Sequence, residues 1–164
     1  MRHSLTFVML FAILGCGERV TIQPGEVGKE LGTGGLEEEI RKPGAFRMDS
    51  CIIAACPKLV RLQTQKATKE FTIDKLFLPK SNVDMTKVSV GIQFQIRQDD
   101  ASIETAYSEV RPVQANTVEG SEASSDLILL ITSDMLYQTY VQRKAPDAII
   151  TALRSTKCCP EPPS

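Results

Sequence analysis

The clearest pattern in the chain is a strict alternation of apolar and polar positions over residues 87–97, KVSVGIQFQIR. Alternate side chains of a β-strand point to opposite faces, so this period of two is typical of a strand with one face on the core and one in water. The segment therefore predicts a half-buried strand of an antiparallel sheet. Its apolar face consists of Val88, Val90, Ile92, Phe94 and Ile96.

Three shorter patterns earlier in the chain predict further strands. Residues 18–31, ERVTIQPGEVGKEL, alternate on both sides of Pro24-Gly25. Proline fixes φ at the second position of a turn and glycine accepts a positive φ at the third, so we expect two short strands about a tight turn. Residues 59–64 (LVRLQT) and 70–78 (EFTIDKLFL) predict two more strands.

A helical period follows the alternating segment. Asp99 or Asp100 can cap a helix over residues 99–111, and Pro112 ends the pattern. We expect a short amphipathic helix that packs one stripe on the sheet. The stripe, at spacings of four and three, consists of Ile103, Tyr107 and Val110.

The last quarter of the chain is predicted to be helical. The polar segment 112–125 is expected to be a loop, and the broad apolar face over 127–140 predicts a helix after it. Pro146 and Asp147 suit the first turn of a further helix. The predicted fold class is α+β: a small, mostly antiparallel sheet with one short helix packed on it and a C-terminal helical segment.

The N-terminal segment has the layout of an export signal. Arg2 provides a positive start, an apolar run extends over 5–14, and Gly15-Cys16 follows. About ten apolar residues are too few to span a bilayer as a helix, which needs roughly 20. The segment is thus expected to be removed after export.

The end of this segment is similar to a bacterial lipobox, ILGC over residues 13–16, in which the cysteine becomes the lipid-modified first residue. The resemblance implies several acyl chains on Cys16 and a bacterial cell envelope location. Gly17 stands where an aspartate would favour the inner membrane, so the outer membrane is slightly favoured. An ordinary signal peptide and a short core helix with a buried cysteine are the alternatives.

Composition narrows the function classes. The formal net charge is −1, so the chain lacks the positive charge that is typical of nucleic-acid-binding proteins. The single histidine is His3, inside the export segment, so histidine-based triads and histidine-containing zinc or haem sites are not expected in the mature chain. We therefore expect a protein that is not an enzyme and that carries no cofactor.

Four cysteines remain after Cys16, and three pairings among them are open. An even number of thiols in an oxidising envelope predicts disulfides. The alternative is an envelope thiol/disulfide or metal-handling protein, although the spacing is not a tight tetrahedral signature. The four candidates are Cys51, Cys56, Cys158 and Cys159.

Two further groups are weaker candidates. Asp99-Asp100 and the acidic run Glu37-Glu38-Glu39 could act as paired carboxylates in a small hydrolase, but adjacent acidic residues are usually solvated or cap helices. Two tyrosines could anchor a protein partner, although at helical spacing they are more often core residues. These are Tyr137 and Tyr140.

The order of these elements resembles the SPFH (band 7, stomatin/prohibitin-type) domain. VTIQPGEVGKEL is similar to the opening strand, turn and strand of that family, and RKPGAF to a later Pro-Gly step. KVSVGIQFQIRQDDASIETAY resembles its central strand and short helix, and YQTYVQRKAPDAIITALRS resembles its closing helical segment.

The resemblance implies a membrane-associated scaffold that organises lipids or partner proteins, as a homo-oligomer or with another protein. The membrane contact would be the lipid anchor. The expected organisation is a signal peptide over 1–15, a lipidated N-terminus over 16–17, an SPFH-like domain over 18–156 with a sheet part (18–111) and a helical part (126–156), and a flexible tail over 157–164.

Overall fold

The computed structural model describes residues 18–48, 56–115 and 127–155, which belong to two compact units. The sheet unit comprises the chain up to Gln63 together with Arg111–Ile131. The hairpin unit comprises Thr64–Val110 and the chain from Thr132 onwards. Antiparallel strand pairs predominate and short helices accompany them, so the predicted α+β class is confirmed.

A five-stranded sheet forms the centre of the sheet unit. Only the pair β5–β9 is parallel, and the other neighbours are antiparallel. Both edge strands contain only two residues, and β3 pairs only with Leu31 and Gly32 of β2. In spatial order the strands are β3 (Gly35–Leu36), β2 (Glu26–Gly32), β5 (Lys58–Gln63), β9 (Ile128–Ile131) and β8 (Val113–Gln114).

A second, two-stranded sheet in this unit pairs β1 (Arg19–Ile22) with β4 (Gly44–Arg47) in antiparallel register. The predicted turn between β1 and β2 is present: Gly25 has φ 83° and the Glu26 amide donates to the Gln23 carbonyl at 3.1 Å. The two strands beside the turn nevertheless belong to different sheets, because β2 pairs with β3 and β5.

The core of the sheet unit lies between these two sheets. Gly28 on β2 is closely packed in this core, because a Cβ there would lie 2.6 Å from Ile22 Cδ1 and 2.9 Å from Leu59 Cδ1. The absence of a side chain lets β1 approach β2. The buried core cluster contains Val20, Ile22, Met48, Leu59, Ala115 and Ile128, with Phe46 and Leu130 packed against it.

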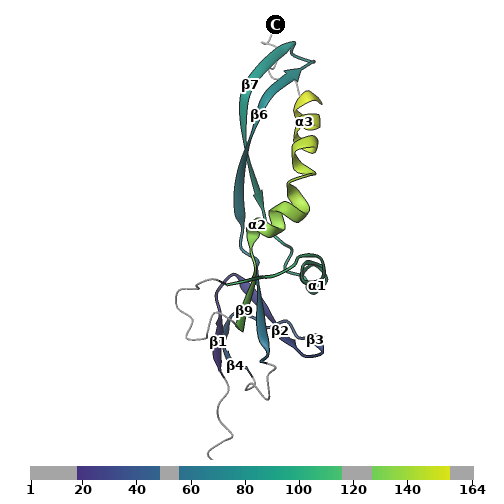
Figure 1. Cartoon of the computed structure of the whole chain (residues 1–164). Helices are drawn as coiled ribbons and strands as arrows, with labels where there is room; N and C mark the ends of the chain where they lie inside the picture. The colour runs from purple at the N-terminus through teal and green to yellow at the C-terminus, as the bar shows by residue number, and fades with distance from the viewer. Residues whose placement is uncertain (1–17, 49–55, 116–126, 156–164) are drawn as a thin grey trace, which may run out of the picture. The chain divides into compact units, whose positions relative to one another are not determined.

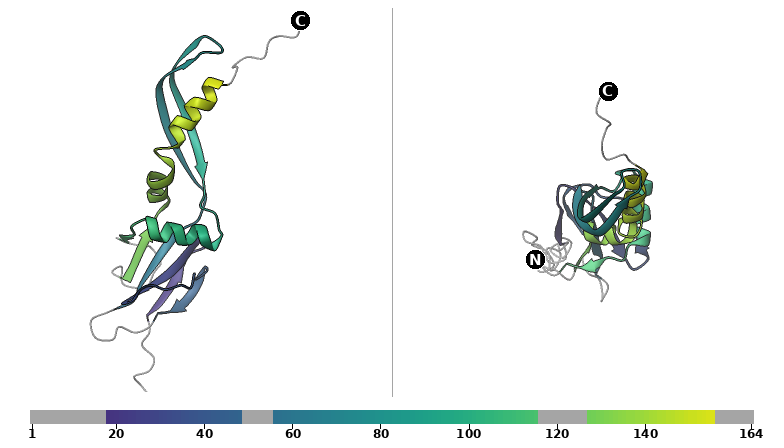
Figure 2. Two further views of the ribbon diagram at one scale, coloured as in Figure 1. Left: turned by 90° about the vertical axis from the view of Figure 1, so that its right-hand side faces the viewer. Right: turned by 90° about the horizontal axis from the view of Figure 1, so that it is seen from above.

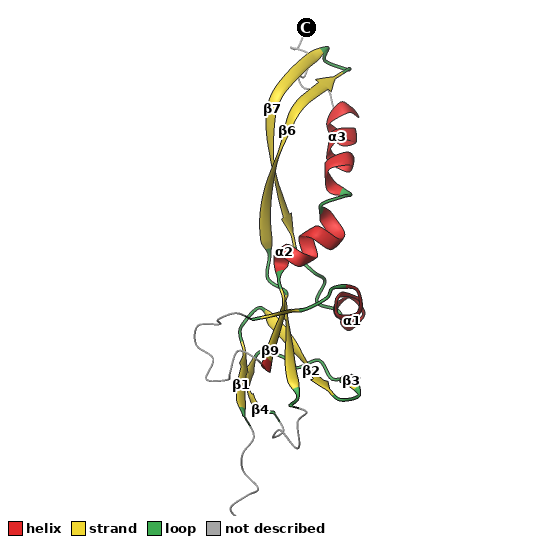
Figure 3. Cartoon of the chain, viewed as in Figure 1, coloured by secondary structure: helices red, strands yellow, loops and turns green. Residues whose placement is uncertain are grey.

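The helix predicted over residues 127–140 is wrong at its beginning. Residues 128–131 form the strand β9, drawn in yellow in Figure 3, and the helix begins only at Ser133. A continuous apolar run fits a buried strand as well as a buried helix, and periodicity alone does not separate the two. Pairing with both β5 and β8 selects the strand.

A long antiparallel hairpin dominates the hairpin unit (Figure 1). Strand β6 (Ala67–Leu78) pairs with β7 (Val83–Phe94), with Ala67 opposite Phe94 and Leu78 opposite Val83. From Val88 to Phe94 the even positions are half-buried and the odd positions are exposed. The strand predicted from the alternation is therefore confirmed, with its boundaries shifted towards the N-terminus.

The hairpin changes its apolar face at Lys87, which has φ 55°. On β6 the change falls between Ile73 and Lys75, which pair with Val88 and Thr86. The apolar positions of β6 are Phe71 and Ile73 before the change and Leu76 and Leu78 after it. The strand β7 is consequently divided into a regular alternating part after Lys87 and an exposed part before it.

Helix α1 (Asp100–Glu109) has the predicted cap and stripe. The Asp99 carboxylate accepts a hydrogen bond from the Ser102 amide at 3.0 Å, which satisfies one of the free N–H groups of the first turn. Ile103, Tyr107 and Val110 are buried, as the spacing predicts.

The C-terminal helical segment lies along the hairpin in both Figure 1 and Figure 2. It consists of α2 (Ser133–Leu136), the π-helical turn η2 (Tyr137–Val141) and α3 (Ala145–Ser155). Lys69 of β6 forms an ion pair with Asp134 at 2.7 Å, and the Lys80 ammonium donates to the Ser155 carbonyl. These contacts attach both ends of the segment to the hairpin.

We expect Gly28→Val to lower the free energy of unfolding by about 1–3 kcal/mol, because the new side chain would overpack the space beside Ile22 and Leu59. The matched control is Gly32→Val on the same strand, where no atom lies within 4 Å of a Cβ, and a change within about 0.5 kcal/mol is expected. Urea denaturation measures both. Equal effects of the two substitutions would contradict the packing assigned to Gly28.

Candidate functional site

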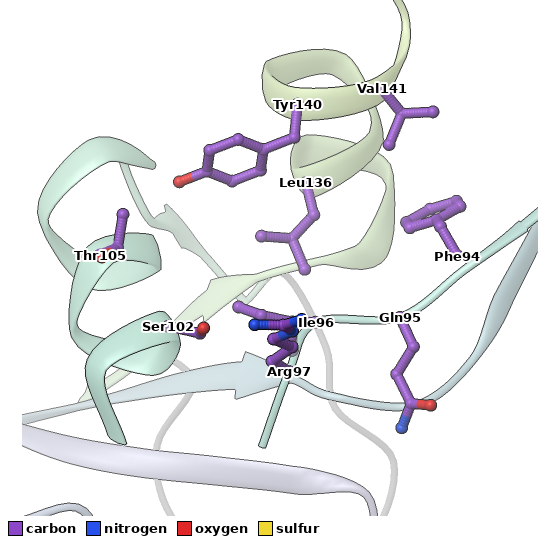
Figure 4. A pocket seen from close by; sticks show the side chains of 9 residues that line it. All are labelled: Phe94, Gln95, Ile96, Arg97, Ser102, Thr105, Leu136, Tyr140 and Val141. Carbon is purple, nitrogen blue, oxygen red and sulfur yellow. The ribbon is translucent and has the colours of Figure 1, made fainter. Parts of the chain in front are cut away.

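A cavity of about 300 Å³ lies within the hairpin unit (Figure 4). Three parts of the unit line it: the end of β7 with the segment after it, the first half of α1, and the α2–η2 helical turn. Most of its surface is apolar. The lining residues are Phe94, Gln95, Ile96, Arg97, Ser102, Thr105, Leu136, Tyr140 and Val141.

The alternating pattern of β7 continues into the cavity wall. Phe94 and Ile96 are half-buried, whereas Gln95 between them is exposed. The Gln95 side-chain amide donates to the Thr64 carbonyl at 3.1 Å, which fixes this segment beyond the last ladder pair. The Phe94 ring lies 5.7 Å from the Tyr137 ring at an interplanar angle of 38°, so aromatic contact joins β7 to η2.

Tyr140 supplies the buried hydroxyl group of the cavity. Its ring points from η2 towards α1 in Figure 4, and the oxygen has no partner with hydrogen-bond geometry among the described residues. Burial and, secondarily, the nearby Glu109 carboxylate raise the pKa of Tyr140 to about 12. The phenol therefore stays neutral throughout the physiological range.

The other hydroxyl groups at the cavity already have partners. Ser102 Oγ donates to Asp99 Oδ1 at 3.0 Å, and Thr105 Oγ1 donates to the Ala101 carbonyl at 2.8 Å. The Ser102 hydrogen bonds, with a smaller contribution from the positive charge of Arg97, lower the pKa of Asp99. The arrangement suits a small apolar group in a cavity at the lower end of ligand-pocket sizes.

The sheet unit contains a buried ion pair that the sequence patterns did not single out. Arg61 Nε and Nη2 each lie 2.7 Å from Glu26 Oε2, and the two side chains are only 3% and 9% exposed. The pair joins β5 to β2. The sequence feature that could have predicted this ion pair is the arginine inside the apolar run LVRLQT, because a charge in a buried strand requires a partner.

Three glutamates of the sheet unit, two of them from the acidic run, lie near Arg41. Its guanidinium lies 3.2 Å from Glu30, 3.7 Å from Glu37 and 3.9 Å from Glu39, and it stacks over the Phe46 ring at 4.7 Å. The structure thus places Glu37 and Glu39 in an ion-pair cluster. The other carboxylate candidates lie at the start of α1, where Asp99 is the N-cap and Asp100 is the first helical residue.

The predicted cysteine sites are largely outside the described residues. Cys16, Cys51, Cys158 and Cys159 all fall there. Cys56 is described: it is exposed and disulfide-bonded, and its partner is not among the described residues. The pairing therefore stays a prediction. Within residues 18–48, 56–115 and 127–155, no group of three or more His, Cys, Asp or Glu side chains is arranged to hold a metal ion.

The two tyrosines proposed as partner anchors are both half-buried in the hairpin unit. Tyr137 stacks with Phe94, and Tyr140 lines the cavity. The sequence patterns place Ile96 on the apolar face of the strand predicted over 87–97 and Leu136 in the helix predicted over 127–140. The two residues line the same cavity only because β7, α1 and α2 lie close together in the folded chain.

In the described part of the chain, no helix has both the length and the apolar character needed to cross a membrane. Comparisons with protein-family models, with curated proteins and with solved structures found no match. The similarity to the SPFH domain therefore stays a prediction from the residues.

The high pKa of Tyr140 predicts a separate alkaline titration step. An unfolded chain loses the phenol proton near pH 10, whereas the folded chain keeps it to about pH 12, so folding stability should fall as the pH rises through this window. The difference in phenolate absorbance between wild type and Tyr140→Phe, recorded on folded protein, should have its midpoint near pH 12. A midpoint near pH 10 would show that the hydroxyl is not shielded.

Proposed function

We propose that this chain is a lipid-tethered, non-catalytic scaffold or interaction lipoprotein of the SPFH/band 7 type in the bacterial cell envelope, where it organises membrane or partner proteins. The observation that carries the proposal is the N-terminal segment: Arg2, an apolar run over 5–14 and Gly15-Cys16. After removal of residues 1–15, Cys16 would be the first residue and would carry the lipid.

Such a tether needs no membrane-spanning helix. Each buried acyl CH₂ contributes about 0.8 kcal/mol, so one chain binds reversibly and several hold durably. Strand β1 begins at Arg19, three residues after Cys16, and an extended chain reaches at most about 3.6 Å per residue. A lipid on Cys16 would therefore hold the sheet unit within roughly 11 Å of its attachment point.

An interaction role is supported by the apolar side chains near the hairpin turn. Phe77, Val83 and Met85 are 46%, 44% and 38% exposed. Val83 and Met85 lie opposite the buried Leu78 and Leu76, at the border of the packed region. Val83 and Met85 share one face of the hairpin, and Phe77, which lies opposite Asp84, is on the other face. Exposed apolar side chains are found at surfaces that contact a protein or a membrane.

Metabolic labelling with a radioactive fatty acid tests the tether. Wild-type protein should be labelled and should sediment with membranes, whereas Cys16→Ala should lose the label, because the acceptor sulfur is gone. The matched control is Cys159→Ala, which removes a cysteine elsewhere and should keep the label. An unlabelled wild type, or equal labelling of Cys16→Ala, would refute the tether.

A further inference from the structure

Among the described residues of the hairpin unit, one long strand edge has no backbone partner. Strands β6 and β7 form a sheet of two strands only. Within the described residues, no backbone hydrogen bond other than those to β6 involves a residue of β7. Half of the N–H and C=O groups of this twelve-residue strand therefore face away from its single partner.

The two edges of the hairpin differ in their protection. Strand β6 carries Lys69, Glu70, Asp74 and Lys75, and α3 lies beside it in Figure 1. Charged side chains and a covering helix are the usual means by which proteins prevent a strand edge from pairing. On β7, Asp84 and Lys87 are the charged residues, and residues 88–96 contain no charge and no proline. The free edge from Val88 onwards is thus the unprotected part.

The sequence of this edge is complementary to itself. In an antiparallel pair of two β7 strands centred on Gly91, Val88 lies opposite the partner's Phe94 and Val90 opposite the partner's Ile92. All four are half-buried on the same face of the hairpin, so the pairing extends one apolar surface across both copies. On the exposed face, Ser89 lies opposite the partner's Gln93.

Neighbouring registers are less favourable. Centring the pair on Ile92 places Lys87 opposite the partner's Arg97, and like charges directly opposite destabilise a pair. Centring it on Val90 places Thr86 opposite the partner's Phe94. An axis between two residues, which shifts the pairing by one position, sets apolar positions against polar ones.

We propose that β7 pairs antiparallel with β7 of a second copy of this chain about a two-fold axis at Gly91, forming a four-stranded sheet. A closed two-fold contact uses the same surface on both subunits, which is what a self-complementary edge provides. At Gly91 a Cβ would meet no atom within 4 Å, so the exposed face of the hairpin has room for a side chain at the axis. The pairing names a second copy of the chain as a partner for the proposed scaffold role. It rests on that role only because a shared membrane would raise the local concentration of the chains.

Cysteine cross-linking of the full chain tests the register. Opposite residues of an antiparallel pair have Cα atoms about 4.5–5.5 Å apart, within the range that a disulfide bridges. Gly91→Cys should therefore form a covalent dimer on mild oxidation. Gln93→Cys is the matched control, because in this register the two copies of residue 93 are four positions apart, about 13 Å.

The expected result is at least tenfold more dimer from Gly91→Cys than from Gln93→Cys on a non-reducing gel, above the background of the native cysteines. A mixture of Ser89→Cys and Gln93→Cys chains should cross-link, since these positions are opposite. Equal yields from Gly91→Cys and Gln93→Cys, or no dimer from Gly91→Cys, would overturn the proposal. So would a Gly91→Cys adduct with a different protein in native membranes.

Charge placement gives a second test that leaves the hairpin core unchanged. Ser89 and Gln93 are both exposed, so substitutions there should preserve the circular dichroism spectrum. The pair Ser89→Lys/Gln93→Lys should abolish the dimer in sedimentation, whereas Ser89→Lys/Gln93→Glu should restore it by placing opposite charges across the axis. Identical behaviour of the two double variants would contradict the register, and fatty-acid labelling of Cys16 would report separately on the tether.

Discussion

A pair of antiparallel strands satisfies only half of its backbone hydrogen-bonding groups, and the hairpin unit is arranged around this constraint. The helical segment α2, η2 and α3 supplies packing for β6 and β7 without adding a strand. On β6, which α3 contacts, Leu76 and Leu78 are buried, while Val83 and Met85 of β7 are exposed. Among the described residues, the backbone edge of β7 has no partner.

The five-stranded sheet of the sheet unit meets the same constraint differently. Its central strands pair on both sides, and its edges are reduced to the two-residue strands β3 and β8. The ion pair between Arg61 and Glu26 adds a fixed register between β5 and β2, because separating two buried opposite charges would leave each without compensation. The two-stranded sheet β1–β4 also lacks further strand partners among the described residues, but its strands have four residues each, whereas β6 and β7 have twelve each. This contrast is the physical basis for assigning interaction to the hairpin.

Local patterns predicted the elements whose faces differ in environment. The alternation at 87–97 identified β7, and the spacing of Ile103, Tyr107 and Val110 identified α1, because one face of each is buried and the other is wet. Strand β9 was missed because it is apolar without alternation. The cavity and the Glu26–Arg61 pair join residues far apart in the chain, and no periodicity within one segment encodes such contacts.

The central claim is that a lipid-tethered chain associates with itself. The mass of the native protein, extracted from membranes in detergent and kept intact during measurement, tests both parts together. The expected result is two copies of the chain beginning at Cys16, each increased by the mass of acyl groups. A single unmodified chain would contradict both the tether and the self-association.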